Sequence, residues 1–286
     1  MRILITGGAG MLARALLAEL SGRGHETVAL DRRALDVTDA AAVGEVVGGL
    51  RPDVVIQCAA YADVDGSEAR EEYARLINAD SARTAAWACS SVGARFVYPS
   101  TDYVFDGSGT RPYRTTDVPR PISAYGRSKL LGERAAAEAE DFLVVRTAWL
   151  YGPERRGFVR GIVERARRVA AGEPGPLRVV DDQRGAPTWT PSAAALIAGL
   201  IERRVPKGIW HATNAGSVTR YELALEALRL AGLADVPVEP VGSEEFAAPA
   251  PRPRYSVLDL SQTEAVLGPV RPWDDALAEA IGSGAY

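Results

Sequence analysis

The pattern of apolar positions in the first half of the chain alternates between two periods. Buried strands are expected where short apolar runs occur, at 2–6, 27–30, 54–57, 95–98 and 142–145. Between these runs, apolar residues recur three and four positions apart and predict helices at 11–23, 39–50, 67–89 and 125–139. Strands that alternate with helices are typical of right-handed crossovers. This half therefore predicts an α/β fold with a doubly wound parallel Rossmann sheet.

Beyond Tyr151 the alternation becomes irregular. Helices are expected at 155–171, 191–203 and 221–230, strands at 177–180 and 208–212, and a proline-rich arm at 247–253. Residues 1–150 are thus expected to form a Rossmann domain, completed by part of 180–215. Residues 151–286 are expected to form mainly a smaller α/β lobe.

Composition excludes several classes of protein. The 286 residues carry a formal net charge of −4, which gives no support for a nucleic-acid partner. The longest apolar stretch, at 193–201, is too short to span a bilayer. With no cleavable signal visible before the first strand, we expect a cytoplasmic protein without a membrane partner. Two cysteines and two histidines supply neither a disulfide framework nor a metal cluster, so no metal is expected.

The loop after the first strand reads Gly-Gly-Ala-Gly-Met-Leu-Ala at 7–13. Gly7 and Gly10 allow a tight turn and let a pyrophosphate approach the backbone. Met11 and Leu12 open the following helix, whose free N–H groups attract phosphate. Asp31 ends the second strand about 20 positions later, the spacing of a ribose-binding acid in dinucleotide folds. A dinucleotide site is therefore predicted here.

The residues after the second strand do not distinguish between NADH and NADPH as the coenzyme. Asp31 can accept the ribose hydroxyls of NAD, whereas Arg32 or Arg33 can pair with the 2′-phosphate of NADP. Asp36 and Val37 are expected to flank the adenine.

Tyr125 and Lys129 stand four residues apart on a predicted helix and therefore share one face. An ammonium beside a phenol favours the phenolate and lowers the pKa of the tyrosine. Only two of the 33 basic residues are lysines, the other being Lys207, so a merely solvated position would more often be arginine. Ser100 and Thr101, at the carboxyl end of the fourth strand, are expected over the same cleft. Together these residues predict hydride-transfer chemistry.

At this point the chain resembles the dTDP-4-dehydrorhamnose reductase family of extended short-chain dehydrogenases/reductases. The most specific segments are Thr-Asp-Tyr-Val-Phe-Asp-Gly at 101–107 and Asp-Gln-Arg-Gly-Ala-Pro-Thr at 182–188. The resemblance implies NAD(P)H-dependent reduction of the C4 ketone of a dTDP-4-dehydro-6-deoxyhexose, with dTDP-L-rhamnose as the default product. It also implies that residues 1–150 bind NAD(P), that 151–286 mainly bind the nucleotide sugar, and that a dTDP-sugar is the partner. A homodimer is left open as the assembly.

The resemblance also implies roles for individual residues. Thr101, Tyr125 and Lys129 would form the catalytic triad, with Tyr125 protonating the C4 oxygen and Lys129 holding the nicotinamide ribose. The coenzyme would be lined by Cys58, Ala59 and Ala60. The substrate would be held by Val64, Asp65, Asp102, Tyr103, Trp149 and Arg252. Of these, Trp149 would wall the sugar pocket and Arg252 would meet the diphosphate.

Some positions depart from the family pattern. Gln57 and Ala62 stand where Asn and Thr are usual, and Arg254-Tyr255 replaces the usual Ala-Asn beside the substrate pocket. Ala15 stands where some members carry an acidic magnesium ligand, which again predicts no metal.

Two other functions remain as alternatives. One is reduction of a different dTDP-deoxysugar at C4 for antibiotic or secondary-metabolite glycosylation. The other is a non-catalytic binding subunit like the regulatory subunit of methionine adenosyltransferase, against which the intact Thr101, Tyr125 and Lys129 argue. A 4,6-dehydratase is disfavoured because Tyr103, and not a second carboxylate, follows Asp102.

Overall fold

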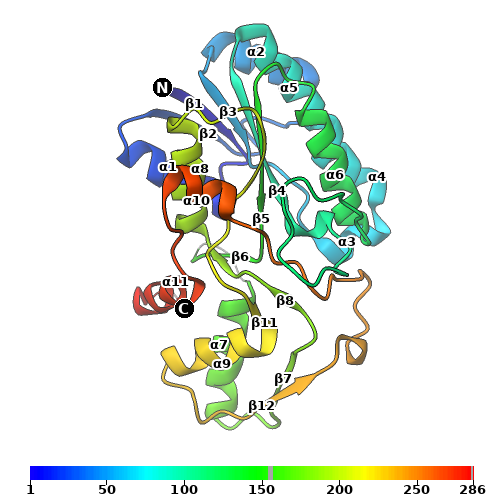
Figure 1. Ribbon diagram of the computed structural model, residues 1–286, viewed down its shortest axis with the longest axis vertical. Helices are drawn as coiled ribbons and strands as arrows, with labels where there is room; N and C mark the ends of the chain where they lie inside the picture. Colours follow the sequence, from blue (N-terminus) through cyan, green and yellow to red (C-terminus); the bar gives the residue numbers. More distant parts are fainter. Residues whose placement is uncertain (154–156, 285) are drawn as a thin grey trace.

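The computed structural model describes residues 1–153, 157–284 and 286, and its largest feature is a six-stranded sheet (Figure 1). The neighbouring strands all pair in parallel. Their order across the sheet is β10 (Gly208–His211), β5 (Phe142–Thr147), β4 (Arg95–Thr101), β3 (Val54–Gln57), β1 (Arg2–Thr6) and β2 (Glu26–Leu30). The prediction of a doubly wound parallel sheet is therefore confirmed.

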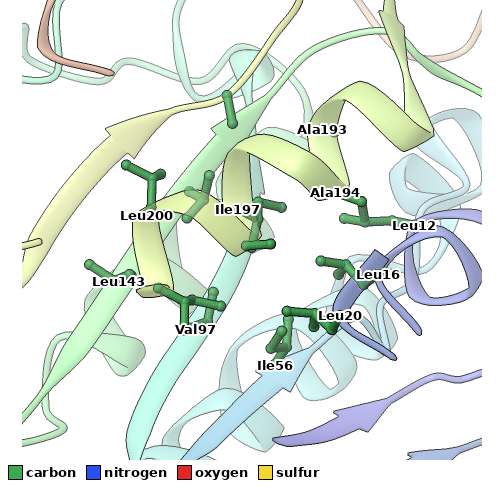
Figure 2. Packing of buried hydrophobic residues seen from close by; sticks show 14 of the residues in the cluster. Leu12, Leu16, Leu20, Ile56, Val97, Leu143, Ala193, Ala194, Ile197 and Leu200 are labelled. Atoms are coloured by element: carbon green, nitrogen blue, oxygen red, sulfur yellow. The ribbon is translucent and has the colours of Figure 1, made fainter. Parts of the chain in front are cut away.

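Helices cover both faces of this sheet (Figure 1). One face carries α1 (Met11–Gly22) and α8 (Thr190–Glu202); the other carries α2 (Ala40–Leu50), α5 (Ser81–Val92) and α6 (Ala124–Ala136). Figure 2 shows Leu16 and Leu20 of α1 near Ile56 of β3, with Ile197 and Leu200 of α8 over the neighbouring strands. These side chains form one buried cluster, so α8, although late in the chain, belongs to the same core as α1. No helix among the described residues is both long and apolar enough to cross a membrane.

The remaining elements pack around a separate apolar core, which we call the small lobe. It contains α7 (Phe158–Ala170), α9 (Arg220–Leu230), α11 (Trp273–Gly282) and the paired strands β7 (Leu177–Val180) and β12 (Val238–Val241). The short pairs β6 (Leu150–Tyr151) with β9 (Thr188–Trp189) and β8 (Arg184–Gly185) with β11 (Val218–Thr219) lie between this lobe and the sheet (Figure 1). Helix α10 (Ser261–Leu267) packs on α8. The predicted helix at 155–171 is found from Phe158, and its first two positions lie outside the described residues.

The prediction of a single helix at 67–89 is wrong. The segment consists of α3 (Val64–Ala69), α4 (Glu71–Arg75), a π-helical turn η1 (Leu76–Asp80) and then α5. The first break lies at Arg70, which leaves helical geometry with φ −137°. The π turn points Asn78 inward, where its carbonyl accepts the Tyr98 hydroxyl at 2.7 Å and its amide donates to Ser128 at 2.9 Å. These bonds join the segment to β4 and α6 behind the end of the sheet, so tertiary contacts override the helical period.

Helix α6 approaches β4 more closely than a side chain would allow. A Cβ added at Gly132 would overlap the Tyr98 hydroxyl and the Asn78 carbonyl, and one at Gly126 would overlap the Tyr103 carbonyl. Both glycines face inward on the helix that carries Tyr125 and Lys129. Glycine at these positions therefore brings those two side chains to the carboxyl end of β4.

We predict that Gly132→Ala destabilises the fold by about 3 kcal/mol, because the new methyl group must push α6 away from β4. The matched control is Gly44→Ala in α2, where a Cβ meets open space. It should raise the free energy of unfolding by about 0.5–1 kcal/mol. Urea unfolding followed by circular dichroism measures both. Equal unfolding midpoints for the two variants would contradict the close-packing argument.

Candidate active site

A cavity of about 460 Å³ lies at the carboxyl ends of β3, β4 and β5. Ligands of open parallel sheets bind at this edge. We call it the sheet-end cavity. Predicted site residues that line it are Gly10, Met11, Leu12, Cys58, Ala60, Val64, Thr101, Asp102, Tyr103, Tyr125, Lys129 and Trp149. The structure therefore brings the proposed triad together with part of the glycine loop.

An adjoining cavity of about 280 Å³, the glycine-loop cavity, shares Gly10, Cys58 and Ala60 with the first. Further predicted residues that line it are Gly7, Arg32, Asp36, Val37 and Ala59. Small residues therefore separate the two cavities, and a dinucleotide can extend from one into the other.

Four predicted site residues do not line these two cavities. Asp31 turns its carboxylate onto its own loop, where it accepts the N–H groups of Arg33 at 2.9 Å and Ala34 at 3.1 Å. Arg33 is exposed. Asp65 and Arg252 form an ion pair with each other, with a shortest N–O distance of 2.8 Å. The pKa of Asp65 is lowered by that guanidinium.

Lys129 is held on the inner side of the sheet-end cavity and is 3% exposed. Its Nζ donates to the Pro99 carbonyl at 2.7 Å and lies 3.9 Å from the centre of the Tyr98 ring. Burial lowers its pKa to about 7, although Glu133 one turn later opposes the shift. Its surroundings therefore favour the neutral amine over the ammonium form.

Tyr125 lies in the first turn of α6, which begins where the Ser123 hydroxyl accepts the Gly126 N–H at 3.1 Å. Burial raises the pKa of Tyr125, while its hydrogen bond to Thr101 acts in the opposite direction. The expectation that Lys129 lowers the pKa of this phenol is wrong for this arrangement, because desolvation outweighs the other effects. At neutral pH the phenol keeps its proton and can act as a proton donor.

A buried ion pair lies behind these residues. Arg146 of β5 binds both carboxylate oxygens of Glu133 of α6, at 2.8 and 2.7 Å. Both side chains are at most 4% exposed. The Ser100 hydroxyl donates to the same carboxylate at 2.6 Å. Ser100 thus lines the cleft as expected, but its hydroxyl is committed to the support of the site.

Thr101, at the end of β4, has a different set of partners. Its Oγ1 donates to Oδ1 of Asp102 at 3.1 Å and accepts the Tyr103 N–H at 3.2 Å. Asp102 opens a short 3₁₀ turn, η2 (Asp102–Val104), and is 2% exposed. Its Oδ2 accepts the Ser256 hydroxyl at 2.5 Å. Burial raises the pKa of this carboxyl to about 6, against the effect of both hydrogen bonds.

Arg220 also lines the sheet-end cavity, although it was not among the predicted site residues. Its guanidinium carbon lies 3.5 Å from the centre of the Trp149 ring and 5.1 Å from that of Phe158. Trp149 itself has a left-handed backbone, with φ 45°. Burial lowers the pKa of Arg220, while a hydrogen bond to Tyr103 opposes that shift. In the sequence Arg220 is only the start of a helix, and no spacing relates it to the sheet.

Arg220 also borders a third cavity, the outer cavity, of about 640 Å³. This cavity lies between the small lobe and the proline-rich arm. Its lining includes Phe158, Arg178, Phe246, Arg252 and Arg254. Arginine and aromatic side chains are suited to phosphates and a planar base, respectively.

The comparisons with known proteins agree with this geometry. The chain matches the family model described as RmlD substrate binding domain over residues 1–285. It is 46% identical to a dTDP-4-dehydrorhamnose reductase of Streptomyces griseus, over 98% of this chain and 93% of that protein. It is 43% identical to a dTDP-4-keto-6-deoxy-D-glucose reductase of Streptomyces niveus, over 98% and 96%.

Among solved structures, the dTDP-4-dehydrorhamnose reductase of Bacillus anthracis in complex with NADP is similar, with a TM-score of 0.93. It is 35% identical and the comparison covers 99% of both chains. Sequence and fold therefore agree over nearly the whole length, and the resemblance stated from the motifs is confirmed. The chain belongs to the RmlD family of dTDP-4-dehydrorhamnose reductases.

Proposed function

We propose that this protein reduces the C4 ketone of a dTDP-4-dehydro-6-deoxyhexose with NAD(P)H, the default reaction being dTDP-4-dehydro-L-rhamnose to dTDP-L-rhamnose. One observation carries the proposal. A partly buried phenol with a raised pKa, Tyr125, lines one cavity with Thr101 and Lys129, and this cavity adjoins the glycine-loop cavity. The names of the relatives from S. griseus and B. anthracis support the same reaction.

The residues of the glycine-loop cavity fit a dinucleotide. Gly7 has φ 68°, and a Cβ there would lie 2.5 Å from the Ala59 nitrogen. The first turn of α1 lacks a side-chain cap, so its N–H groups are open to a pyrophosphate. When bound, the coenzyme supplies the hydride that reaches the ketone carbon.

The proposed roles of the chain's own groups follow from their protonation. Tyr125 gives its phenol proton to the C4 oxygen as negative charge develops there, and Thr101 holds the phenol in place. Lys129 presents its ammonium toward the coenzyme ribose from its anchor on the Pro99 carbonyl. Trp149 walls the sugar, and its left-handed backbone sets the ring against Arg220.

The two halves of the chain divide the ligands between them in this proposal. Residues 1–150, with β10 added to their sheet and α8 packed on it, bind the coenzyme. The rest of 151–286 binds the nucleotide sugar, its nucleoside diphosphate occupying the outer cavity. Arg220 meets the diphosphate because it borders both cavities, and Arg252 takes part from its ion pair with Asp65. Val64 and Tyr103 complete the sugar side.

A second candidate is the C4 reduction of a different dTDP-deoxysugar. The relative of S. niveus, named for dTDP-4-keto-6-deoxy-D-glucose, is nearly as similar as that of S. griseus. Arg254 lines the outer cavity, and the backbone of the next residue, Tyr255, forms a β-bridge with Arg184. These are two of the positions where the sequence departs from the family pattern. These residues lie at or beside the outer cavity, where they could determine which dTDP-sugar is bound.

We predict that Tyr125→Phe lowers kcat by about two orders of magnitude or more, because the ketone oxygen loses its proton donor. The Kd for NADPH should stay within twofold. The assay follows NADPH oxidation with dTDP-4-dehydro-β-L-rhamnose and identifies the product by NMR. Unchanged turnover in the variant would remove Tyr125 from the mechanism. A wild-type protein that reduces none of the dTDP-4-keto-6-deoxysugars would refute the proposed function.

For the coenzyme we predict a preference for NADPH. Arg32 lines the glycine-loop cavity and bonds to Tyr73 at 3.4 Å, whereas the Asp31 carboxylate is occupied by its own loop. Arg32→Ala should therefore lower kcat/KM for NADPH tenfold or more and change that for NADH less than twofold. Arg33→Ala is the matched control, since Arg33 does not line the cavity. Equal losses in both variants, or with both coenzymes, would contradict the assignment.

We predict that Arg220→Ala raises the KM for the dTDP-sugar about tenfold or more, since a phosphate loses a charged donor. The control is Arg229→Ala on the same helix, which is exposed and paired with Glu226. It should leave the KM unchanged. The kinetic constants at saturating NADPH decide between them, and an equal KM for both variants would place the diphosphate elsewhere.

A further inference from the structure

The hydrogen bonds around Tyr125 continue beyond Thr101 to a second acid. Thr101 lines the sheet-end cavity together with Tyr125, whose pKa it lowers, and its hydroxyl donates to Oδ1 of Asp102 at 3.1 Å. We propose that Asp102 is a positioning residue that returns to Tyr125, through the Thr101 hydroxyl, the proton that Tyr125 gives to the substrate. This role rests on the proposed reductase function. It stands beside the expectation that Asp102 binds substrate, since Asp102 lines the sheet-end cavity while each of its carboxylate oxygens has one protein partner.

Whether Thr101 donates its proton to Asp102 or toward Tyr125 depends on the protonation state of Asp102. An ionised carboxylate only accepts, so the Thr101 hydroxyl must donate to it and can only accept from Tyr125. Thr101 also accepts the Tyr103 N–H at 3.2 Å. Its one proton and two lone pairs are then all used. A protonated Asp102 can instead donate to Thr101, which frees the threonine proton to point at Tyr125. Thr101 is again fully used, with the chain of donors reversed.

The reversed arrangement completes the proton balance of the reduction. Tyr125 becomes a phenolate when its proton bonds to the C4 oxygen. An O–H bond then forms on Tyr125 as the Thr101 O–H bond breaks, and the Asp102 proton restores the threonine hydroxyl. Asp102 is left as a carboxylate and takes one proton from solvent before the next turnover. Each ketone thus receives a hydride from the coenzyme and, in net terms, one proton from water.

The surroundings of Asp102 permit both of its states near neutral pH. The charged and titratable groups that face it are Arg220 from α9, Tyr103 on its own turn and Tyr125 from α6. Ser256, on the segment after the proline-rich arm, donates to Oδ2 at 2.5 Å. Burial raises the pKa of Asp102 to about 6, and the Ser256 bond, the Thr101 bond and Arg220 act to lower it. The acid form therefore grows as the pH falls through about 6.

The test compares kcat of the wild-type enzyme and Asp102→Asn between pH 5 and 9. The asparagine amide can donate to Thr101 and its oxygen can accept from Ser256, so the geometry is kept while the transferable proton is lost. Wild-type kcat should fall as the pH rises above about 6. The variant should lose tenfold or more of kcat at low pH and lack this limb, with the KM for the sugar and the Kd for NADPH within twofold. An unchanged kcat and profile would overturn the proposal.

Ser256→Ala separates a relay from a purely structural role. Because the Ser256 bond lowers the pKa of Asp102, its removal should move the kcat limb to higher pH. If Asp102 had only a structural role, Ser256→Ala would not shift the pH dependence of kcat. If Asp102→Asn lost activity equally at every pH while Ser256→Ala left the limb in place, the proposal would be overturned. Thermal unfolding of each variant shows that it is folded.

A measurement without turnover keeps this proposal separate from the proposed function. Carboxyl-¹³C NMR of the coenzyme-free protein identifies the Asp102 signal by its loss in Asp102→Asn. It should titrate between pH 5 and 7, and at higher pH in Ser256→Ala. If the wild-type protein reduces no ketosugar, the reductase function fails, and this titration alone decides. A signal that does not titrate in that range, or does not move, overturns the role of Asp102.

Discussion

The rest of the site depends on the buried ion pair between Glu133 and Arg146. It joins α6 to β5, and through the Ser100 hydroxyl it also joins β4. Loss of one partner would leave an uncompensated buried charge, at a cost of about 3–5 kcal/mol. Lys129 stands one turn before Glu133, whose charge favours the ammonium form of the lysine. The pair therefore fixes α6 against the sheet and favours the charged form of a lysine that lines the sheet-end cavity.

The close packing of α6 has the same consequence. Gly132 and Gly126 leave no room for a Cβ, so α6 lies close against β4 at Tyr98 and against the following turn at Tyr103. Tyr125 and Thr101, which come from different elements, are thereby brought to the same cavity. The placement of Tyr125 thus follows from how the core behind it packs.

Much of this architecture can be predicted from the sequence because its causes are local or follow a general rule. The strand and helix periods, the glycine loop and the spacing of Tyr125 and Lys129 belong to short segments. Because the carboxyl ends of parallel strands lie at one edge of a sheet, Thr101 can be placed near Tyr125 and Lys129 from the sequence. The π turn at Asn78, the Asp65–Arg252 pair and the position of Arg220 depend on residues distant in sequence. Trp149 acquires its left-handed backbone in the same long-range setting. No local pattern encodes these contacts.

Desolvation affects the acids and the arginines of the site differently. Burial raises the pKa of Tyr125 and of Asp102 and lowers that of Lys129, so each of the three shifts toward its neutral form. In their neutral forms, Tyr125 and Asp102 each hold a proton that can be transferred at the carboxyl end of the sheet. A diphosphate needs the opposite, a charge that survives burial, and guanidinium groups keep theirs. Arg220 stands at the boundary between the sheet-end cavity and the outer cavity, where the two requirements meet. In the proposed reaction, proton transfer and anion binding therefore fall to different side chains, because burial neutralises the acids and leaves the guanidinium charged.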